Sequence, residues 1–262
     1  MPRTCPSEKG LRPWWRGGPS VWALTFGVML MTAACSTLAQ PFFRPQSRYA
    51  PAAPLSPTDP FLQDGAAKYH ALAPNYVMQE TESSCSVAST TIVLNTALGQ
   101  RGKRPVSQAT VLGTDRTGRW RAATSHDRSP GVDLEGLSLL LMQAFYSFGM
   151  REVGVDVVHV NNESPEALNL LRHDLDLSER FPNDYFILAN FRQASFLRAG
   201  GGGHISVVGA YDEARERVLI LDVDREGFEP YWVPTRLFLA GMHTPDDETG
   251  EPRGYLVVRM HR

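Results

Sequence analysis

Three residues could together carry out nucleophilic catalysis: Cys85, His204 and Asp222. His204 follows Cys85 by 119 residues, and Asp222 follows His204 by 18. A thiolate can attack an acyl carbon, an imidazole can take and return the proton, and a carboxylate can orient the imidazole. Taken singly, each has an ordinary structural interpretation: a core thiol, a histidine beside a glycine run, and a cap at a strand end. The order of the three favours catalysis.

The local settings of these residues fit that chemistry. Cys85 is expected in the first turn of a helix, where the helix dipole and unpaired backbone N–H groups favour a thiolate. His204 follows the glycine run 200–203 just before an apolar strand, and glycine lets a substrate approach the backbone closely. Papain-like enzymes have the same order, Cys, then His more than about a hundred residues later, then Asn or Asp.

A glutamine precedes the cysteine, because Gln79 lies six residues before Cys85. In the papain architecture, a glutamine just upstream of the nucleophile donates to the developing oxyanion together with the nucleophile's own N–H. Spacing alone favours an exposed polar residue before a helix, and the papain-like order of the other residues supports the catalytic interpretation. Gln79 is therefore a candidate oxyanion donor.

Other candidate sites are weaker. The seven histidines show no paired ligand spacing, and a single remaining thiol cannot form a cysteine metal cluster. The acidic run 246–248 is predicted to be a solvated turn. The four glycines lack the strand, loop and helix context of a nucleotide-binding motif.

Apolar periodicity predicts three helices in the first part of the chain, at 83–99, 134–149 and 164–177. Their expected end signals are Ser83 or Ser84 and Gly99 for the first, Asp133 and Gly149 for the second, and Ser164 followed by Pro165 for the third. The stretch 102–130 is irregular and polar and is expected to be a surface loop.

Strand-like runs dominate the second part, at 185–191, 204–211, 217–223 and 254–260. Helices followed by strands indicate an α+β domain with the two kinds of element segregated. The strands at 204–211 and 217–223 are expected to pair through the DEARER turn. That pairing would bring His204 and Asp222 together on one face.

The N-terminus has the pattern of an export signal. A basic stretch precedes an uncharged apolar run at 21–34, which is too short to span a bilayer comfortably and favours a signal peptide over a short buried helix. The signal, residues 1–39, ends either at a lipoprotein site before Cys35 or by cleavage after Ala39. The protein is then periplasmic or lipid-anchored facing the periplasm. A Pro-rich linker at 40–65 and a catalytic domain at 66–262 follow.

Net charge limits the macromolecules that this protein can bind, and the cysteine count limits its disulfide bonds. The net charge of -2, from 26 basic and 28 acidic residues, gives no excess for binding nucleic acid. Cys5 and Cys35 lie in the exported signal or at its end, so Cys85 remains as a thiol without a disulfide partner. Such a thiol is either a buried small hydrophobe or a reactive group.

Two segments resemble the phytochelatin synthases: QETESSCSVASTTIVLNTALG, and the long segment from GGGHISVVGAYDEARERVLILDVDREGFEPYWVP to GYLVV. The resemblance covers about Ala66 to Arg262. It implies a papain-like cysteine proteinase fold with an N-terminal helical part and a C-terminal antiparallel sheet. It also implies that Cys85, His204 and Asp222 form the triad, with Gln79 as oxyanion donor.

Further implications concern the substrate. Arg225 in DVDR matches a family arginine expected to contact a substrate carboxylate or the acyl-enzyme, and Gly202 and Gly203 are expected to border the substrate. This sequence departs from the family pattern in two respects. Ser86 replaces the usual family glycine after the nucleophile, and the Cys-rich C-terminal domain of the plant enzymes is missing, as in short bacterial members.

The resemblance implies attack on the Cys–Gly bond of glutathione, with release of glycine and a γ-glutamylcysteinyl thioester. Water would then give γ-glutamylcysteine, and a second glutathione would give a phytochelatin. No protein-bound cofactor is expected, whereas Cd or Zn held as a glutathione thiolate complex would stimulate transfer in heavy-metal detoxification. The oligomeric state is left open, with a homodimer as one option.

Two rival interpretations remain: a general exported papain-like cysteine peptidase, and a non-catalytic lipoprotein that binds thiol peptides. Cleavage of longer peptides would indicate the first rival. An inert thiol, barely alkylated by iodoacetamide at about pH 6, would indicate the second.

Overall fold

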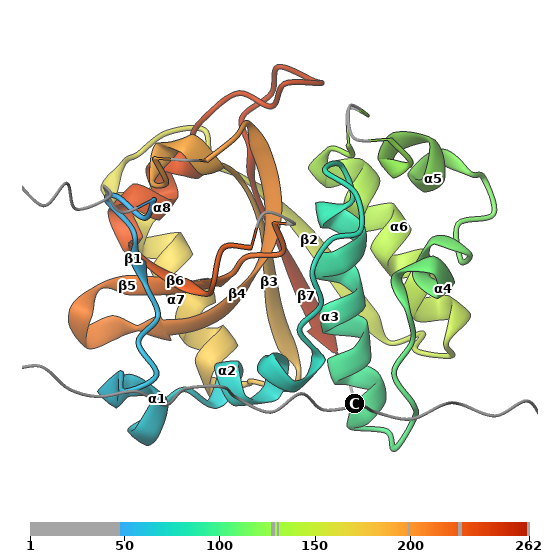
Figure 1. Ribbon diagram of the computed structural model, residues 1–262, viewed down its shortest axis with the longest axis horizontal. Coiled ribbons are helices and arrows are strands. Elements are labelled where there is room, and N and C mark those ends of the chain that lie inside the picture. Colours follow the sequence, from blue (N-terminus) through green and yellow to red (C-terminus); the bar gives the residue numbers. More distant parts are fainter. Residues whose placement is uncertain (1–47, 127–128, 130, 199, 225–226, 261–262) are drawn as a thin grey trace, which may run out of the picture. The chain divides into compact units, whose positions relative to one another are not determined.

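An antiparallel sheet forms the centre of the protein. The computed structural model describes residues 48–126, 129, 131–198, 200–224 and 227–260 (Figure 1). Within them, seven strands pair in the order β1-β6-β5-β4-β3-β7-β2, and every pair is antiparallel. The strands are β1 (Ala53–Pro54), β2 (Val153–His159), β3 (Tyr185–Arg192), β4 (Gly203–Asp212), β5 (Arg217–Leu221), β6 (Tyr231–Pro234) and β7 (Gly254–Met260).

Helices cover both faces of this sheet. In the described part they are α1 (Pro60–Asp64), α2 (Ala67–Leu72), α3 (Cys85–Gly99), α4 (Gln108–Leu112), α5 (Arg119–Thr124), α6 (Leu134–Ser147), α7 (Pro165–Arg180) and α8 (Thr235–Met242). Short 3₁₀ turns occupy Ala73–Asn75, Gln193–Ser195 and Glu213–Arg215. Figure 1 shows α3 to α6 gathered on one side of the sheet. This mixture of helices with an antiparallel sheet confirms the predicted α+β class.

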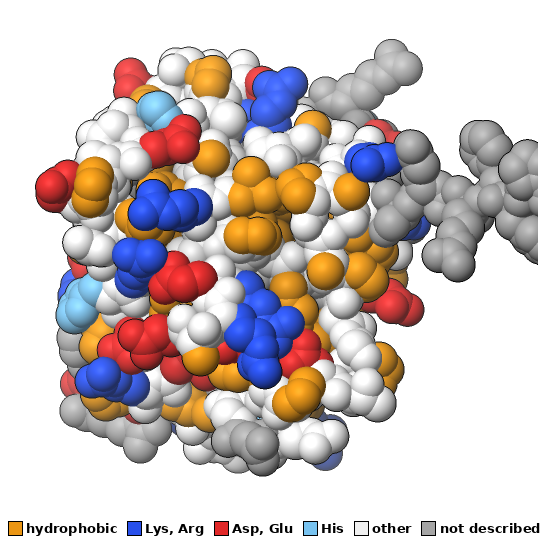
Figure 2. Space-filling model, turned by 90° about the vertical axis from the view of Figure 1, so that its left-hand side faces the viewer, with side chains coloured by type: hydrophobic (Ala, Val, Ile, Leu, Met, Phe, Trp, Pro, Cys, Tyr) orange, Lys and Arg blue, Asp and Glu red, His pale blue; other side chains and the backbone are white. Residues whose placement is uncertain are grey.

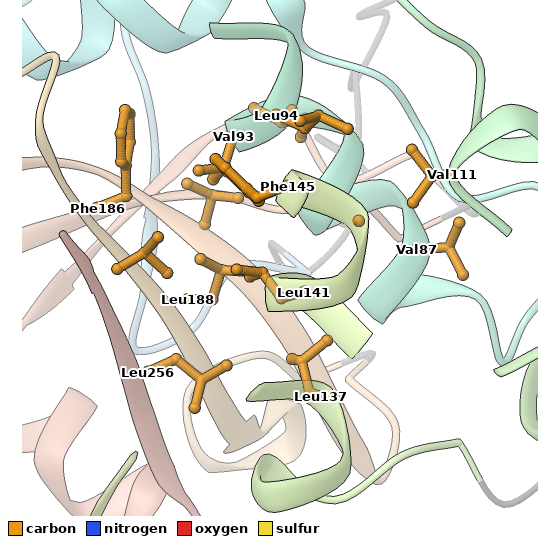
Figure 3. Close-up of a cluster of buried hydrophobic side chains, with 14 of the residues drawn as sticks. Val87, Val93, Leu94, Val111, Leu137, Leu141, Phe145, Phe186, Leu188 and Leu256 are labelled. Atoms are coloured by element: carbon orange, nitrogen blue, oxygen red, sulfur yellow. The ribbon is translucent and has the colours of Figure 1, made fainter. Parts of the chain in front are cut away.

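Alternation along β3 shows how the sheet serves two cores. Phe186 and Leu188 pack with α3 and α6, whereas Ile187 and Ala189 pack in the cluster formed by α7 and α8. Successive strand residues face opposite sides, so a strand covered on both sides reads as a continuous apolar run. Figure 3 shows the first core, where Val93, Leu94, Leu137, Leu141, Phe145 and Leu256 surround Phe186 and Leu188.

Helix α3, which begins at the candidate nucleophile, is buried from Cys85 to Leu98. A helix enclosed on all sides must satisfy its own polar side chains. Ser89 Oγ donates to Ile205 O of β4 at 3.0 Å, and Thr91 Oγ1 donates to Val87 O at 2.7 Å. Buried hydroxyls therefore tie the helix to the sheet and to itself.

The predicted ends of the helices are largely confirmed. Asp133 caps α6 by accepting from Gly136 N at 2.6 Å, and Gly149 follows that helix at φ +81°. Ser164 caps α7 by accepting from Ala167 N, with Pro165 at the first position. Ser84 lies at the cap position of α3 but makes no side-chain cap bond. Its hydroxyl bonds instead to Thr81.

Three expectations differ from the structure. Residues 102–130 were expected to form a surface loop, yet they contain α4 and α5, whose Val111 and Trp120 are fully buried. Strands β2 and β6 and helix α8 were not predicted. Part of the expected linker, 48–65, packs on the domain: β1 pairs with β6 and Ala52 is buried, because its apolar side chains find a sheet edge.

The predicted signal peptide, including Cys5 and Cys35 with the proposed site of lipid attachment, lies outside the described residues. Within the described ranges no helix has the length and apolar character needed to cross a bilayer. On the face shown in Figure 2, acidic and basic side chains are interspersed with apolar ones.

Candidate active site

The nucleophile candidate lies where a helix begins. Cys85 is the first residue of α3, carries a free thiol and is 9% exposed. Val87 N and Ala88 N both bond to Ser84 O at 3.1 Å. The N–H groups of the first two helical residues therefore lack acceptors within the helix, and a thiolate or an oxyanion at this end would be stabilised by them.

The histidine and aspartate meet through the pairing of β4 with β5, as predicted. His204 is the second residue of β4, and Asp222 directly follows β5. His204 Nε2 lies 2.7 Å from Asp222 Oδ1, and Ser206 Oγ lies 2.9 Å from the same nitrogen. Both partners are on Nε2, so Nδ1 is the ring nitrogen available to exchange a proton with Cys85, which lines the same hollow as His204.

The pKa of His204 shows which effect dominates at the site. Burial alone lowers the pKa of this imidazole, but the charge and hydrogen bond of Asp222, together with the interaction with Cys85, raise it well above the ordinary value. Burial likewise works to raise the pKa of Asp222, and the contact with His204 outweighs it and lowers the pKa. A charged imidazolium beside the thiol is the arrangement that stabilises a thiolate.

Four donors surround the Asp222 carboxylate, which is fully buried. Besides His204, Oδ1 accepts from Asp224 N at 2.8 Å, while Oδ2 accepts from Tyr231 Oη at 2.5 Å and from Gln193 Nε2 at 3.2 Å. A buried carboxylate is tolerated only with such compensation. Gln193 and Tyr231 were not predicted, because no local pattern marks residues that meet Asp222 only in the folded chain.

A hollow of about 70 Å³ opens beside the cysteine. Its lining includes Cys85, Gly203, His204, Asn190, Asp246 and Arg253. A larger hollow of about 480 Å³ lies between α1, α7 and the β4–β5 connection, and its lining contains no residue of the Cys–His–Asp group. The ion pair beside the thiol, not the size of the hollow, identifies the reactive site.

Arg253 forms one wall of the smaller hollow and is 2% exposed. Its Nη1 donates to Asn190 Oδ1 at 3.1 Å and to Asp246 Oδ2 at 2.7 Å, and its Nη2 donates to Asp247 Oδ2 at 2.9 Å. The expectation of a purely solvated acidic turn is therefore wrong for Asp246, whose side chain is 13% exposed.

The sequence contains a signal for the contact between Arg253 and Asp246. The loop after Thr244 folds back on itself, with Asp246 N bonded to Glu251 O and Gly250 at φ +74°. The Thr-Gly pair in the acidic segment is typical of such a turn, which returns the chain so that Arg253 meets Asp246.

The glycines predicted to border the substrate have different roles. A Cβ on Gly203 would lie 2.4 Å from Arg253 Nη1, so glycine is needed for Arg253 to reach the hollow. Gly202 lies beside Asp247, at 3.4 Å from Oδ2 to its ideal Cβ. Gly203 lines the hollow that contains Cys85, and Gly202 is not among the residues that line it.

Gln79 is 5% exposed and is held next to the aspartate strand. Its backbone N–H donates to Val223 O at 2.8 Å, and its Nε2 donates to Glu82 O at 3.3 Å. The Oε1 atom is buried without a hydrogen bond. The role of Gln79 as oxyanion donor stays a prediction. Arg225 lies outside the described residues.

Within the described part of the chain, no group of three or more His, Cys, Asp or Glu side chains is arranged to hold a metal ion. The arrangement that is present consists of a thiol at a helix N-terminus, a buried imidazole and a buried carboxylate. These groups define the class of site found in enzymes that use a cysteine nucleophile with a histidine base.

The chain belongs to the phytochelatin synthase family, because residues 58–255 match the family described as Phytochelatin synthase. Among curated relatives, glutathione gamma-glutamylcysteinyltransferase 2 of Arabidopsis thaliana is 28% identical over 77% of this chain and 42% of its own length. The Schizosaccharomyces pombe enzyme of that name is 27% identical over 76% of this chain and 46% of its own length. Glutathione gamma-glutamylcysteinyltransferase 1 of Lotus japonicus is 25% identical over 77% of this chain and 38% of its own length. The chain thus spans less than half the length of these relatives.

Proposed function

We propose that this protein is a cysteine acyltransferase and hydrolase that cleaves the Cys–Gly bond of glutathione. The observation that carries the proposal is the buried contact of His204 with Asp222, at a hollow that His204 lines together with Cys85 and Arg253. Relatives named glutathione gamma-glutamylcysteinyltransferase support the choice of substrate. We also propose that the α+β arrangement is papain-like, as the family resemblance implies.

In the proposed reaction, the Cys85 thiolate attacks the carbonyl carbon of the Cys–Gly peptide bond. The N–H groups at the start of α3 and the Gln79 amide stabilise the oxyanion. His204 donates its proton to the departing glycine amine, and Asp222 keeps the ring oriented. The γ-glutamylcysteinyl thioester on Cys85 is then attacked by water, giving γ-glutamylcysteine, or by a second glutathione, giving a phytochelatin.

The charges of the hollow fit the γ-glutamyl end of glutathione, which carries a carboxylate and an ammonium group. Arg253 can pair with the carboxylate, and the carboxylates of Asp246 and Asp247 can receive the ammonium. The buried Nε of Arg253 has no hydrogen bond within the described structure. A peptide without the γ-linked zwitterion would lose these pairings.

The test compares glycine release from glutathione with cleavage of longer peptides that contain an internal Cys–Gly bond. The proposal expects turnover of glutathione and much slower cleavage of the longer peptides, because a blocked α-amine cannot pair with the acidic side chains. Equal turnover would support the rival peptidase. Absence of turnover, together with a thiol that iodoacetamide barely alkylates at about pH 6, would support a non-catalytic binding protein.

We further propose that heavy metals act through the substrate. Cadmium or zinc held between two glutathione thiolates would make a better second substrate for the thioester. Glycine release by hydrolysis needs one glutathione and should change little with cadmium, whereas dimer formation should rise. Excess free metal should inhibit both, because Cys85 is a soft ligand. Tight stoichiometric metal binding by Cys85→Ser protein in equilibrium dialysis would contradict this proposal.

A further inference from the structure

The loop that leads into the nucleophile is held by the backbone carbonyl groups of residues 124 and 129. Thr81 Oγ1 donates to Thr124 O at 2.9 Å, and Ser83 Oγ donates to Ser129 O at 2.9 Å. These bonds involve side chains just before Cys85 and carbonyls at or beyond the end of α5. A part of the chain that sequence patterns describe as a surface loop therefore supports the reactive helix end.

A third bond reaches the helix itself. Trp120 Nε1 donates to Ser86 Oγ at 3.0 Å, and both side chains are almost fully buried, at 0% and 1% exposure. An indole N–H can only donate, so the serine hydroxyl is the acceptor. Ser86 directly follows Cys85 within the first turn of α3, and the bond therefore acts on the turn that carries the nucleophile.

Trp120 is itself fixed on its other side. Its backbone N–H donates to Asp115 Oδ2 at 2.6 Å, while Asp115 Oδ1 accepts from Thr117 N at 2.9 Å. The indole ring belongs to the same apolar cluster as Cys85, Val87 and Val132. Trp120 is therefore held by its backbone at Asp115 and connects α5 to α3 through its indole N–H.

We propose that Trp120 and Ser86 are a pair of positioning residues that hold the first turn of α3 in its reactive orientation. The bond sets the direction of the Cys85 N–H toward the hollow and keeps the thiol against His204. It supplies by hydrogen bonding a constraint that a glycine at position 86 could not supply. This inference rests on the proposed use of Cys85 as the nucleophile.

The experiment compares Ser86→Ala, Trp120→Phe and the double variant by two measurements. One is the rate of Cys85 alkylation by iodoacetamide from about pH 5 to pH 9, which needs no substrate. The other is kcat and KM for glycine release from glutathione. Each single variant should lose about tenfold in kcat and in alkylation at low pH, with KM within about twofold. The double variant should lose no more than either single one, because one bond is removed in all three.

Thr96→Val serves as a matched control on the same helix. Its hydroxyl donates to Ile92 O at 2.9 Å, at the opposite end from Cys85. Both measurements should stay at wild-type values in this variant. Thermal unfolding reports whether each variant is folded, and Ser86→Ala decides the question if Trp120→Phe does not fold, because it removes one buried oxygen.

Wild-type kcat and alkylation in folded Ser86→Ala would overturn the proposal. Losses that multiply in the double variant would also overturn it, because they would show two independent effects. Failure of the proposed function is distinguishable: wild-type protein would then release no glycine, while the alkylation rates would still report whether the Trp120–Ser86 bond controls the thiol.

Discussion

Two buried basic side chains in this protein have pKa values that are shifted in opposite directions. Lys68 of α2 is fully buried, donates to Pro182 O at 2.8 Å and to Tyr185 O, and lies 3.8 Å from the ring centroid of Phe186. Burial lowers the pKa of Lys68 to about 7, and the more distant charges of Glu179 and Asp184 offset only part of that effect. His204 is as deeply buried, yet its pKa is raised.

The difference lies in direct contact with a carboxylate. Carbonyl groups and a ring face Lys68, whereas Asp222 contacts His204 at 2.7 Å. At His204 the contact with an opposite charge outweighs the loss of hydration, whereas the neutral dipoles around Lys68 do not compensate it fully. His204 is therefore held in its protonated form at neutral pH, whereas Lys68 is near its titration midpoint there.

The largest effect should come from breaking the active-site contact. His204→Ala should lower glycine release by about 10³-fold or more, because neither base nor acid remains. Asp222→Asn should cost less, about tenfold to a hundredfold, because an amide can still orient the imidazole. The Asn variant also gives His204 surroundings like those of Lys68. The pKa of His204 should fall in this variant. Alkylation of Cys85 should then appear only at higher pH than in the wild type.

These variants are compared by steady-state rates and by alkylation profiles, with circular dichroism to show that they are folded. Equal and complete losses in both would argue against an orienting role for Asp222. An unchanged alkylation profile in Asp222→Asn would argue against the ion pair.

Removing the predicted oxyanion donor should have the next largest effect. Gln79→Ala should lower kcat by about a hundredfold, the usual scale for one oxyanion donor. KM for glutathione should change little, because the interaction is made mainly in the transition state. A folded Gln79→Ala protein with wild-type kcat would place the donor elsewhere.

The smallest effect should be on stability at Lys68. Its pKa in the folded state is below that of the unfolded chain, so the unfolded state binds more protons between about pH 7 and pH 10. Stability should therefore rise with pH through this window, by about 2 kcal/mol from pH 7 to pH 9. Lys68→Met should remove that contribution, as measured by urea unfolding at both pH values. The same rise in wild type and variant would contradict a depressed pKa.

The elements that could be predicted from the sequence are those with signals within their own residues. Helix α6 has its Asp133 cap and its Gly149 stop, and strands β3 and β4 are continuous apolar runs, so each has a signal within its own residues. The contact of His204 with Asp222 was also predictable, because the short DEARER connection forces β4 and β5 to pair.

What was missed depends on contacts between distant segments. Helices α4 and α5 have only 5 and 6 residues, too short to be stable alone, and their burial comes from packing against α3. Gln193 reaches Asp222 across 29 residues, and Arg253 reaches Asn190 across 63. Residue types at such separations give no periodic or spacing signal, so only the folded chain brings them together.

The most direct test of the acyl-transfer account is the intact mass of the enzyme, quenched with acid during turnover of glutathione. We expect a mass increase of one γ-glutamylcysteinyl group on Cys85, which is stable to reducing agent at low pH. Free glycine should accompany it, and Cys85→Ser protein should show no increase. Glycine release without any adduct under these conditions, or an adduct that equals whole glutathione and is removed by reducing agent, would contradict it.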